Sequence, residues 1–513
     1  MNKQNYATIK KIMTSTIIKQ IESSKVYDVV IKTPLEKLNS ISLLLNNNIY
    51  LKREDLQPVK SFKIRGAYEK IASLSKTEQQ QGIIAASAGN HAQGVAYSAM
   101  KQNIQATIVM PKTTPDIKVD AVKNFKATVI LHGDSYDDAY LKALDIASKK
   151  QLTFIHAYDD DAVIAGQGTI AKELLTQIDH IDTLVIPVGG GGLLAGIATY
   201  IKAKKPSIKL ISVEPENSNC FQQAYIHNKP IALDSVGIFA EGVAVKQIGE
   251  RPFELTKHII DTTITVSTDE ICAAIKEIYD DIRAIAEPSG ALSLAGIKKI
   301  IQTNNLSNKN IVGILCGANI NFHRLRHISE RAEIGEKKEI LLSIEIPEKK
   351  GSFLSFCNDL KHYSITEFNY RFNNEKKAHI FVGIQTKDSD EINTIIQNLE
   401  KKNYQVTDLS NNELAKLHIR YMVGGTNNTI KNEQLFRFQF PERPNALLNF
   451  LSTLGSDYNI SLFHYRNHGA AYGRVLAGIQ VPPTLNSTFN ALLKKIGYTY
   501  FDETSNPAYK LFL

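Results

Sequence analysis

Residues 183–204 read TLVIPVGGGGLLAGIATYIKAK, and this stretch decides the fold class of the N-terminal part of the chain. An apolar run at 183–188 passes through four consecutive glycines into a segment whose apolar residues recur at helical spacing. Continuous apolar strands that lead into helices are typical of parallel sheets covered by helices. The stretch therefore predicts an α/β fold for the region around it.

Similar units surround this stretch between about residues 30 and 330. Apolar runs at 82–87, 106–110, 208–213 and 311–315 alternate with longer segments of helical periodicity. We expect these runs to be core strands of a parallel sheet. Ligands of such sheets gather beyond the carboxyl ends of the strands, where the glycine-bearing loops of this chain lie.

The glycine run and the leucine after it predict an anion site. Glycines allow successive backbone N–H groups to turn toward one phosphate, and the helix that follows adds its dipole. The run lacks the Lys-Ser/Thr ending of a nucleotide P-loop and the spacing of a dinucleotide fingerprint. We expect it to bind a small phosphorylated cofactor, with a flexible turn as the alternative. The residues concerned are Gly189, Gly190, Gly191, Gly192 and Leu193.

A second motif, KSFKIRGA at residues 60–67, contains Lys63. A lysine amine condenses with an aldehyde cofactor only while it is neutral, and burial beside other cations favours the neutral form. Lys60 and Arg65 are the expected cationic neighbours. The alternative is an ordinary surface lysine on a helix.

A third motif, SAGNH, follows the apolar run at 82–87 and precedes a helical segment. Free N–H groups at a helix start suit a substrate carboxylate, and glycine permits close approach. The candidate substrate-binding residues are Ser87, Ala88, Gly89, Asn90 and His91. Asn90 is alternatively a helix cap, and His91 is alternatively a structural histidine instead of a proton carrier.

The residue pattern changes after about residue 334 to alternating segments flanked by charged residues. An internal repeat with a spacing of 94 to 95 residues appears there. IPEKKGSFLSFCNDL from 346 matches FPERPNALLNFLSTL from 440, SITEFNYR from 364 matches NISLFHYR from 459, and AHIFVGIQ from 378 matches GRVLAGIQ from 473. Each copy predicts strand, helix, strand, strand, helix, a small α+β sandwich with one sheet face covered by helices. We place a catalytic domain at 1–330 and two modules at 337–422 and 431–513.

Composition excludes several classes of protein. The 513 residues carry a net charge of +8 that is spread along the chain, which argues against a nucleic-acid partner. No apolar stretch reaches the length of a membrane span, and the start lacks a signal peptide. Four scattered cysteines form neither a zinc motif nor a disulfide framework. We expect a cytoplasmic protein with no metal and no membrane or nucleic-acid partner.

Five motifs, SFKIRGA, SAGNHAQG, GGGGLLAG, AEPSGA and CGAN, together resemble the threonine and serine dehydratases of the tryptophan-synthase-β-like (fold type II) pyridoxal-phosphate family. The repeat, with TEFNYRF and AKLHIRYMVGG, is similar to the paired ACT-like regulatory modules of the biosynthetic branch of these dehydratases. The resemblance covers essentially the whole chain. It implies that pyridoxal 5'-phosphate serves to convert L-threonine to 2-oxobutanoate and ammonia, the first step of isoleucine biosynthesis.

The resemblance also assigns roles to catalytic residues. It makes Lys63 the residue that binds the cofactor aldehyde and takes the Cα proton, Phe62 a neighbour stacked on the cofactor ring, and Asn90 a partner of the phenolic oxygen. The glycine run would hold the phosphate. Cys316 stands where the family commonly has a serine facing the pyridine nitrogen, and a thiol is a weaker partner. A buried small hydrophobe is the alternative for this cysteine.

Other implications concern the substrate pocket and regulation. Glu287 is expected to line the pocket, with a helix-entry residue as the alternative. The resemblance implies L-serine as a secondary substrate, isoleucine as inhibitor, valine as activator, and a homotetramer. The candidate effector residues recur at matching places of the repeat, although such a repeat could instead serve only subunit contacts. They are Tyr370, Arg371, Tyr465 and Arg466.

The nearest enzymatic rival is a serine racemase or a catabolic serine/threonine dehydratase on the same fold. A serine racemase needs a second acid/base group, and Ala88 stands where such relatives use a serine. Metal-dependent relatives have a carboxylate where this chain has Cys220. A noncatalytic amino-acid sensor is the other rival, and the intact set of Lys63, Asn90 and four glycines argues against it.

Overall fold

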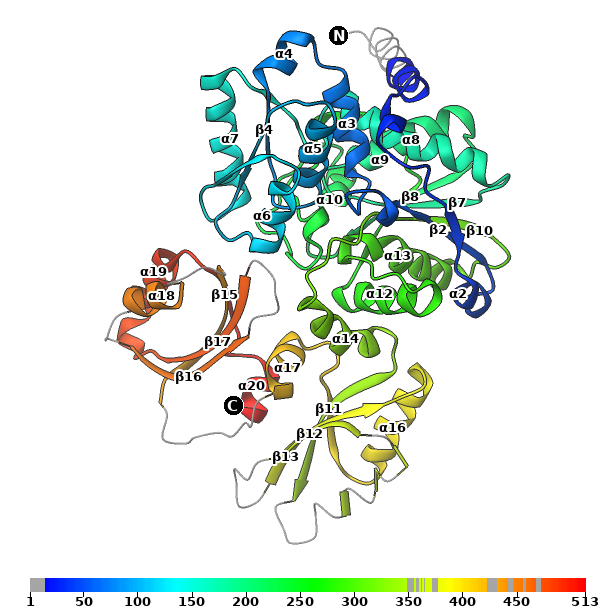
Figure 1. Ribbon diagram of the computed structural model, residues 1–513. Coiled ribbons are helices and arrows are strands. Elements are labelled where there is room, and N and C mark those ends of the chain that lie inside the picture. The colour runs from blue at the N-terminus through cyan, green and yellow to red at the C-terminus, as the bar shows by residue number, and fades with distance from the viewer. Residues whose placement is uncertain are drawn as a thin grey trace. The chain divides into compact units, whose positions relative to one another are not determined.

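The computed structural model describes residues 14–347, 355–356, 359–360, 362–363, 365–370, 377–421, 431–441, 446–454, 458–466 and 472–513. The chain divides into two compact units, Met1–Asn321 and Phe322–Leu513 (Figure 1). Among the described residues, no helix is long and apolar enough to cross a membrane.

The larger sheet of the N-terminal unit has the strand order β1-β2-β10-β7-β8-β9, and its neighbours are parallel except for β1 and β2 (Figure 1). Alternate residues of its strands face opposite layers of helices, because side chains along a strand alternate between faces. Leu184 packs with helices α8 and α9, whereas Val185 lies beside Gly296 of helix α13. The strands are β1 (Leu35–Lys37), β2 (Asn48–Arg53), β7 (Thr183–Pro187), β8 (Lys209–Pro215), β9 (Thr262–Val266) and β10 (Asn310–Leu315).

A smaller sheet with the order β5-β4-β3-β6 is parallel throughout. Ile83 and Ala85 of β3 pack with helix α5, and Ile84 and Ala86 pack with helix α7. The strands are β3 (Ile83–Ala86), β4 (Ala106–Met110), β5 (Thr128–Leu131) and β6 (Thr153–Phe154). The α/β fold expected from the apolar runs is therefore confirmed.

Helices connect and cover these strands. Their bounds in the N-terminal unit are α2 (Asn39–Leu44), α3 (Lys63–Ala72), α4 (Lys76–Gln81), α5 (Asn90–Lys101), α6 (Asp116–Lys123), α7 (Tyr136–Lys150), α8 (Asp161–Gln177), α9 (Gly192–Lys204), α10 (Cys220–His227), α11 (Glu250–Thr256), α12 (Thr268–Ile282) and α13 (Pro288–Asn304).

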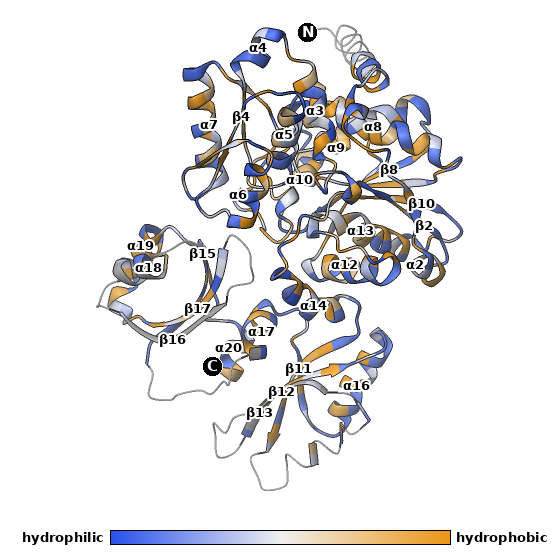
Figure 2. Cartoon of the chain, in the orientation of Figure 1, coloured by the Kyte–Doolittle hydropathy of each residue, from blue (hydrophilic) through white to orange (hydrophobic). Residues whose placement is uncertain are grey.

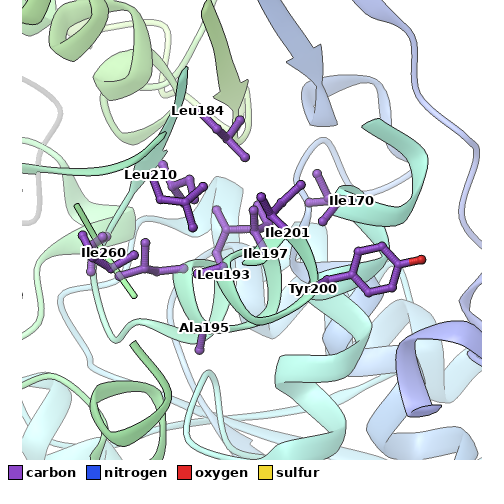
Figure 3. Packing of buried hydrophobic residues seen from close by; sticks show 14 of the residues in the cluster. Ile170, Leu184, Leu193, Ala195, Ile197, Tyr200, Ile201, Leu210 and Ile260 are labelled. Carbon is purple, nitrogen blue, oxygen red and sulfur yellow. The ribbon is translucent and has the colours of Figure 1, made fainter. Parts of the chain in front are cut away.

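The main core of this unit forms around α9. Leu193, Ile197 and Ile201 are spaced by four residues, so they share one helix face, which packs with Leu184 and Leu210 of the sheet (Figure 3). Burial of each such side chain stabilises the fold by about 1.5–3 kcal/mol. Hydrophobic residues gather on the strands between the helix layers (Figure 2). The glycine run at the start of α9 is thus anchored on a rigid core.

The C-terminal unit holds helix α14 (Arg324–Gly335) and two antiparallel sheets with matching orders, β12-β13-β11-β14 and β16-β17-β15-β18. The strands are β11 (Glu339–Pro347), β12 (Ile365–Tyr370), β13 (Lys377–Gln385), β14 (Gln405–Asp408), β15 (Glu433–Pro441), β16 (Asn459–Arg466), β17 (Tyr472–Gln480) and β18 (Thr499–Asp502). The helices are α16 (Ser389–Lys401), α17 (Glu413–Leu417), α18 (Ala446–Leu454), α19 (Asn486–Ile496) and α20 (Pro507–Phe512).

Two features of this unit exceed the sequence-based expectation. Each sheet has a fourth strand, β14 or β18, whose four residues include a single half-buried position and therefore give little apolar alternation. Both sheet faces are also covered. One face packs on the sheet's own helices, while Leu341 and Phe381 of the first sheet and Leu435 and Leu476 of the second join a common core.

Candidate active site

Two segments far apart in the sequence meet beside Lys63. Strands β2 and β10 are parallel neighbours, so the loops that leave their carboxyl ends emerge at the same edge of the sheet. Ser61 forms a β-bridge with Gly317, and the Phe62 N–H donates to the Cys316 carbonyl at 3.1 Å. These contacts fix the start of α3, whose first residue is Lys63.

The Lys63 amine lies in a site that favours its neutral form. Its Nζ donates to the Ala157 carbonyl oxygen at 3.1 Å and lies 5.3 Å from the centre of the Phe62 ring. Burial lowers the pKa of Lys63 to about 8, although Cys316 and Glu287 act in the opposite direction. A neutral amine is the nucleophile that an aldehyde cofactor requires.

The expectation that Arg65 acts as a cationic neighbour of Lys63 is wrong. The guanidinium of Arg65 pairs with Glu54 at 2.7 Å and with Glu173 at 2.6 Å, and Glu173 also pairs with Lys52 at 2.5 Å. All four side chains are at most 1% exposed. This buried network joins α3 to β2 and α8 and so positions Lys63. Sequence reasoning missed it because isolated charged residues carry no periodic signal.

The glycine run forms a packed loop instead of a flexible turn. A Cβ added at Gly190 would lie 2.1 Å from the Tyr158 ring, and one at Gly189 would lie 2.8 Å from Val243. Gly191 has a φ of +91°, which favours glycine. Backbone conformation thus requires glycine at position 191. At position 190 the requirement is steric, because the Tyr158 ring occupies the space of a side chain.

The backbone amides of this loop are available to an anion. Within the part of the chain that the structure describes, the N–H groups of Gly190, Gly191, Gly192 and Leu193 donate no hydrogen bond. The side chain of Leu193 is buried in the core, so only its backbone amide is available to bind an anion. A phosphate fits such a loop, because it binds several N–H groups at a helix start.

Asn90 does not cap a helix with its side chain. Helix α5 begins at Asn90, and its cap position is Gly89. The Asn90 Nδ2 instead donates to Glu287 Oε1 at 2.7 Å, and the Oδ1 accepts from Asn319 Nδ2 at 2.7 Å. These two bonds define which way the amide points, since the reverse orientation would set oxygen against the carboxylate.

Glu287 is the centre of this hydrogen-bond network. Its carboxylate also accepts from Ser289 Oγ at 2.6 Å and from the Asn319 N–H at 3.1 Å. Burial raises the pKa of Glu287, while the bonds from Ser289 and Asn90 act in the opposite direction. Its carboxylate makes no capping bond at the start of α13, so it belongs to the site. Asn319 lies in the CGAN motif, but sequence reasoning gave it no role.

The remaining residues of the SAGNH motif differ in character. Ser87, Ala88 and Gly89 are half-buried, and a Cβ at Gly89 would meet no atom within 4 Å, so open space adjoins this residue. His91 is buried, and its Nε2–H donates to the Ile155 carbonyl oxygen at 2.9 Å. Burial lowers the pKa of His91 to about 3. The imidazole is therefore a neutral structural group.

Cys316 is both buried and adjacent to the site. It belongs to the main apolar core, against which Phe62 packs, and its Sγ lies 3.6 Å from the Ile314 carbonyl oxygen. Burial raises the pKa of the thiol well above its usual value, so Cys316 stays protonated.

Glu214 and Cys220 lie near the start of α10, next to the glycine loop. The Glu214 carboxylate accepts from the N–H groups of Phe221 and Gln222, each at 2.8 Å, and thus satisfies the start of α10. Cys220 Sγ approaches the Gly189 carbonyl oxygen at 3.5 Å. Burial raises the pKa of Glu214 to about 8, although these backbone bonds act in the opposite direction.

The candidate effector residues fall at the ends of equivalent strands. Tyr370 ends β12, and Tyr465 and Arg466 end β16. Arg371 lies outside the described residues.

Comparison with known proteins identifies the class of this site. Residues 26–317 match the family of pyridoxal-phosphate-dependent enzymes, and residues 330–419 and 424–513 match the C-terminal regulatory domain of threonine dehydratase. The fold and the site thus define a pyridoxal-phosphate-dependent lyase. The biosynthetic L-threonine dehydratases of Pasteurella multocida and Escherichia coli are 53% and 50% identical over 497 residues, which cover 97% of this chain and 97% and 96% of theirs. The chain belongs to the family of the biosynthetic threonine dehydratases.

A solved structure agrees with this assignment. The processed form of threonine deaminase isoform 2 from Solanum lycopersicum has a TM-score of 0.62 and 44% sequence identity. The match covers 63% of this chain and 88% of that one. The fold type II catalytic domain and the regulatory domain inferred from the motifs are therefore confirmed.

Proposed function

We propose that this enzyme converts L-threonine to 2-oxobutanoate and ammonia, the first step of isoleucine biosynthesis, with pyridoxal phosphate held at Lys63. One observation carries the proposal. The segment Ala157–Tyr158 contacts both halves of the site, because its Ala157 carbonyl binds the Lys63 amine while the Tyr158 ring packs on Gly190. The lysine and the anion-binding loop are thus held in one fixed arrangement.

Each group of residues has a defined task in this reaction. The free amides of Gly190, Gly191, Gly192 and Leu193 would hold the cofactor phosphate, Phe62 would contact its ring, and Cys316 would offer a neutral thiol to its pyridine nitrogen. The second N–H of the Asn90 amide is available for the phenolic oxygen, because Glu287 takes only the first. Pyridoxal phosphate, once bound, stabilises the electron pair left at Cα when the Cα proton departs.

The protein's own residues handle the proton and the substrate carboxylate. Lys63 would take the Cα proton at its Nζ, since its lowered pKa leaves an appreciable neutral fraction near pH 7. The segment from Ser87 to Asn90 would bind the substrate carboxylate through the backbone N–H groups of Ala88 and Asn90, since those of Ser87 and Gly89 donate to Val109 and to the Ser87 hydroxyl. His91, neutral and bonded to Ile155, supports this segment from behind.

The regulatory part carries finer proposals. We place the two ACT-like modules at 337–422 and 431–513, after a catalytic domain at 1–330. We propose isoleucine as inhibitor and valine as activator, with Tyr370, Arg371, Tyr465 and Arg466 near the effector. A homotetramer and a cytoplasmic location are further proposals, as is L-serine as the secondary substrate. A ligand alters activity only through different affinities for two states.

The test is an assay of ketoacid formation by the full-length protein. L-threonine should give 2-oxobutanoate with a higher kcat/KM than L-serine gives pyruvate, and isoleucine should shift the threonine saturation curve. Preference for serine would place the enzyme on the catabolic branch. Bound cofactor without ketoacid release would support the noncatalytic sensor.

A further inference from the structure

The turn between β6 and α8, residues 156–159, reaches both halves of the active site. The Ala157 carbonyl accepts from the Lys63 amine at 3.1 Å. One residue later, the Tyr158 ring lies against Gly190, where it fills the space that a Cβ would take. The distance between the lysine and the anion-binding loop is therefore set by the shape of this turn.

The side chain of His156 closes the turn. Its Nδ1 accepts from the Asp159 N–H at 2.9 Å and, more weakly, from the Tyr158 N–H at 3.3 Å. The imidazole also packs edge-on against the Tyr158 ring, with 4.7 Å between the ring centres. One imidazole thus holds both the backbone and the side chain of the residue that touches the glycine loop.

This arrangement requires a neutral imidazole. Nδ1 can accept from two N–H groups only while it carries no proton of its own, so the ring proton is on Nε2. Burial lowers the pKa of His156, and the charge of Lys63 acts in the same direction, whereas Asp159 and Asp160 act in the opposite direction. The lowered pKa keeps the ring neutral at neutral pH.

Asp159 connects the same turn to the glycine loop by a second route. Its carboxylate accepts from the Arg251 N–H at 2.9 Å and from the Glu250 N–H at 3.2 Å, at the start of α11. The residue before that helix, Gly249, donates its N–H to the Gly190 carbonyl at 3.1 Å. Gly190 therefore has two supports, an aromatic ring and a backbone hydrogen bond, and both depend on residues 156–159.

We propose that His156 and Asp159 are positioning residues that fix the spacing between Lys63 and the phosphate-binding amides. Neither side chain needs to touch the cofactor. A ligand held at two points gains the strength of both only when the points keep the right separation, because the second contact is then made at high effective concentration. The inference rests on the proposed binding of pyridoxal phosphate between Lys63 and the glycine loop.

The test compares pyridoxal phosphate with pyridoxal, which lacks the phosphate and so reports on the lysine alone. Each is titrated into the full-length, cofactor-depleted enzyme, and the absorbance of the bound form gives its affinity. H156N places an amide oxygen close to the position of Nδ1, whereas H156Q places it one bond further out, near that of Nε2. H156Q should lower the preference for pyridoxal phosphate about 10-fold or more, the usual effect of a lost charge-assisted hydrogen bond. H156N should restore the preference to within about threefold of the parent, because its oxygen still accepts.

A matched pair of acids tests the second route. D159N replaces one acceptor by an NH₂ group that meets a backbone N–H of α11, so it should lower the same preference about threefold or more. D161N is the control, because Asp161 binds Arg251 through its guanidinium, at 2.5 Å, instead of through the backbone of α11. D161N should keep the preference of the parent.

An unchanged preference in H156Q and D159N, whether the two affinities fall in parallel or not at all, would show that the turn only stabilises the fold and would overturn the proposal. So would an H156N variant as impaired as H156Q, since the acceptor at Nδ1 would then not be the feature that matters. If H156Q does not fold, the comparison of D159N with D161N decides the same question. A parent enzyme that bound pyridoxal as tightly as pyridoxal phosphate would refute the glycine loop as the phosphate site, and this proposal with it.

Discussion

Asn412 donates a hydrogen bond from Nδ2 to Oδ1 of Asn506 at 3.1 Å, and the two residues are 94 positions apart, the spacing of the internal repeat. Each of them caps a short helix in its own copy of the repeat. Asn412 accepts from the Ala415 N–H to cap α17, and Asn506 accepts from the Ala508 N–H to cap α20. Equivalent residues of a tandem repeat touch each other only where an approximate twofold axis passes between the copies.

Other equivalent pairs share this neighbourhood. Leu341 and Leu435, again 94 residues apart, belong to the same core, as do Leu414 and Ala508. The same patch of each copy therefore faces its counterpart. A ligand that alters one copy at this surface must alter its packing against the other.

Capture of the cofactor should follow the ionisation of Lys63. Below its pKa of about 8, each pH unit removes about tenfold of the neutral amine, so apoenzyme should bind pyridoxal phosphate faster as the pH rises and then level off above pH 8. Stopped-flow absorbance of the cofactor measures this rate. A rate that continued to climb past pH 10 would mean that Lys63 has an ordinary lysine pKa.

The glycines should respond unequally to alanine. G190A should weaken cofactor retention at least about tenfold, because its Cβ would collide with the Tyr158 ring and move the loop. G89A should fold and retain cofactor normally, since a Cβ there meets open space. Its KM for threonine should rise, because the methyl group enters the space beside the substrate segment. Equilibrium dialysis of cofactor and steady-state kinetics check both, and equal cofactor affinity in the two variants would contradict this reading of the loop.

E287Q should lower kcat about 5- to 100-fold without unfolding the protein. A glutamine can still accept from Asn90, but its amide NH₂ then meets the Asn319 N–H, and one donor loses its partner. The absorbance spectrum of the bound cofactor should change too, since the substitution displaces Asn319, whose Nδ2 donates to the Asn90 Oδ1. S289A, which removes one donor and leaves the Asn90 bond, is the matched control and should retain the parent spectrum. Parent-like turnover and spectrum in E287Q would show that the network is only structural.

E173Q should destabilise the N-terminal unit by about 3–5 kcal/mol, because it leaves Lys52 and Arg65 buried with only Glu54 to balance them. Urea unfolding followed by circular dichroism measures the change. D145N is the control, since the pairs of Asp145 with Lys142 and Lys149 are exposed to solvent and should leave the midpoint unchanged. If both variants unfolded at the same urea concentration, the buried network would not stabilise the fold.

The sequence predicts the scaffold well because strands and glycine loops leave local signals. The apolar runs at 82–87 and 183–188 contain β3 and β7, and the glycine run lies at the start of α9 as expected. The short strands β14 and β18 escaped notice, because four mostly exposed residues have no apolar alternation.

The chemistry of individual side chains was harder to predict, since it depends on partners distant in sequence. Whether Asn90 caps α5 or contacts Glu287, 197 residues away, is decided by tertiary contacts alone. The same holds for Arg65, which pairs with Glu173 and so cannot act on Lys63 as expected. The lowered pKa of Lys63 was expected from burial beside other cations; burial lowers it, but no neighbouring cation contributes.

The hydrogen bond between the Phe62 N–H and the Cys316 carbonyl has a consequence for folding during synthesis on the ribosome. Ribosomes add about 5–20 residues per second, so the lysine segment emerges on the order of tens of seconds before the strand that will hold it. During that interval β2 lacks its neighbour β10, so the backbone N–H and C=O groups of that edge are unpaired. The segment that carries Lys63 therefore reaches its final position only after residue 317 has been synthesised.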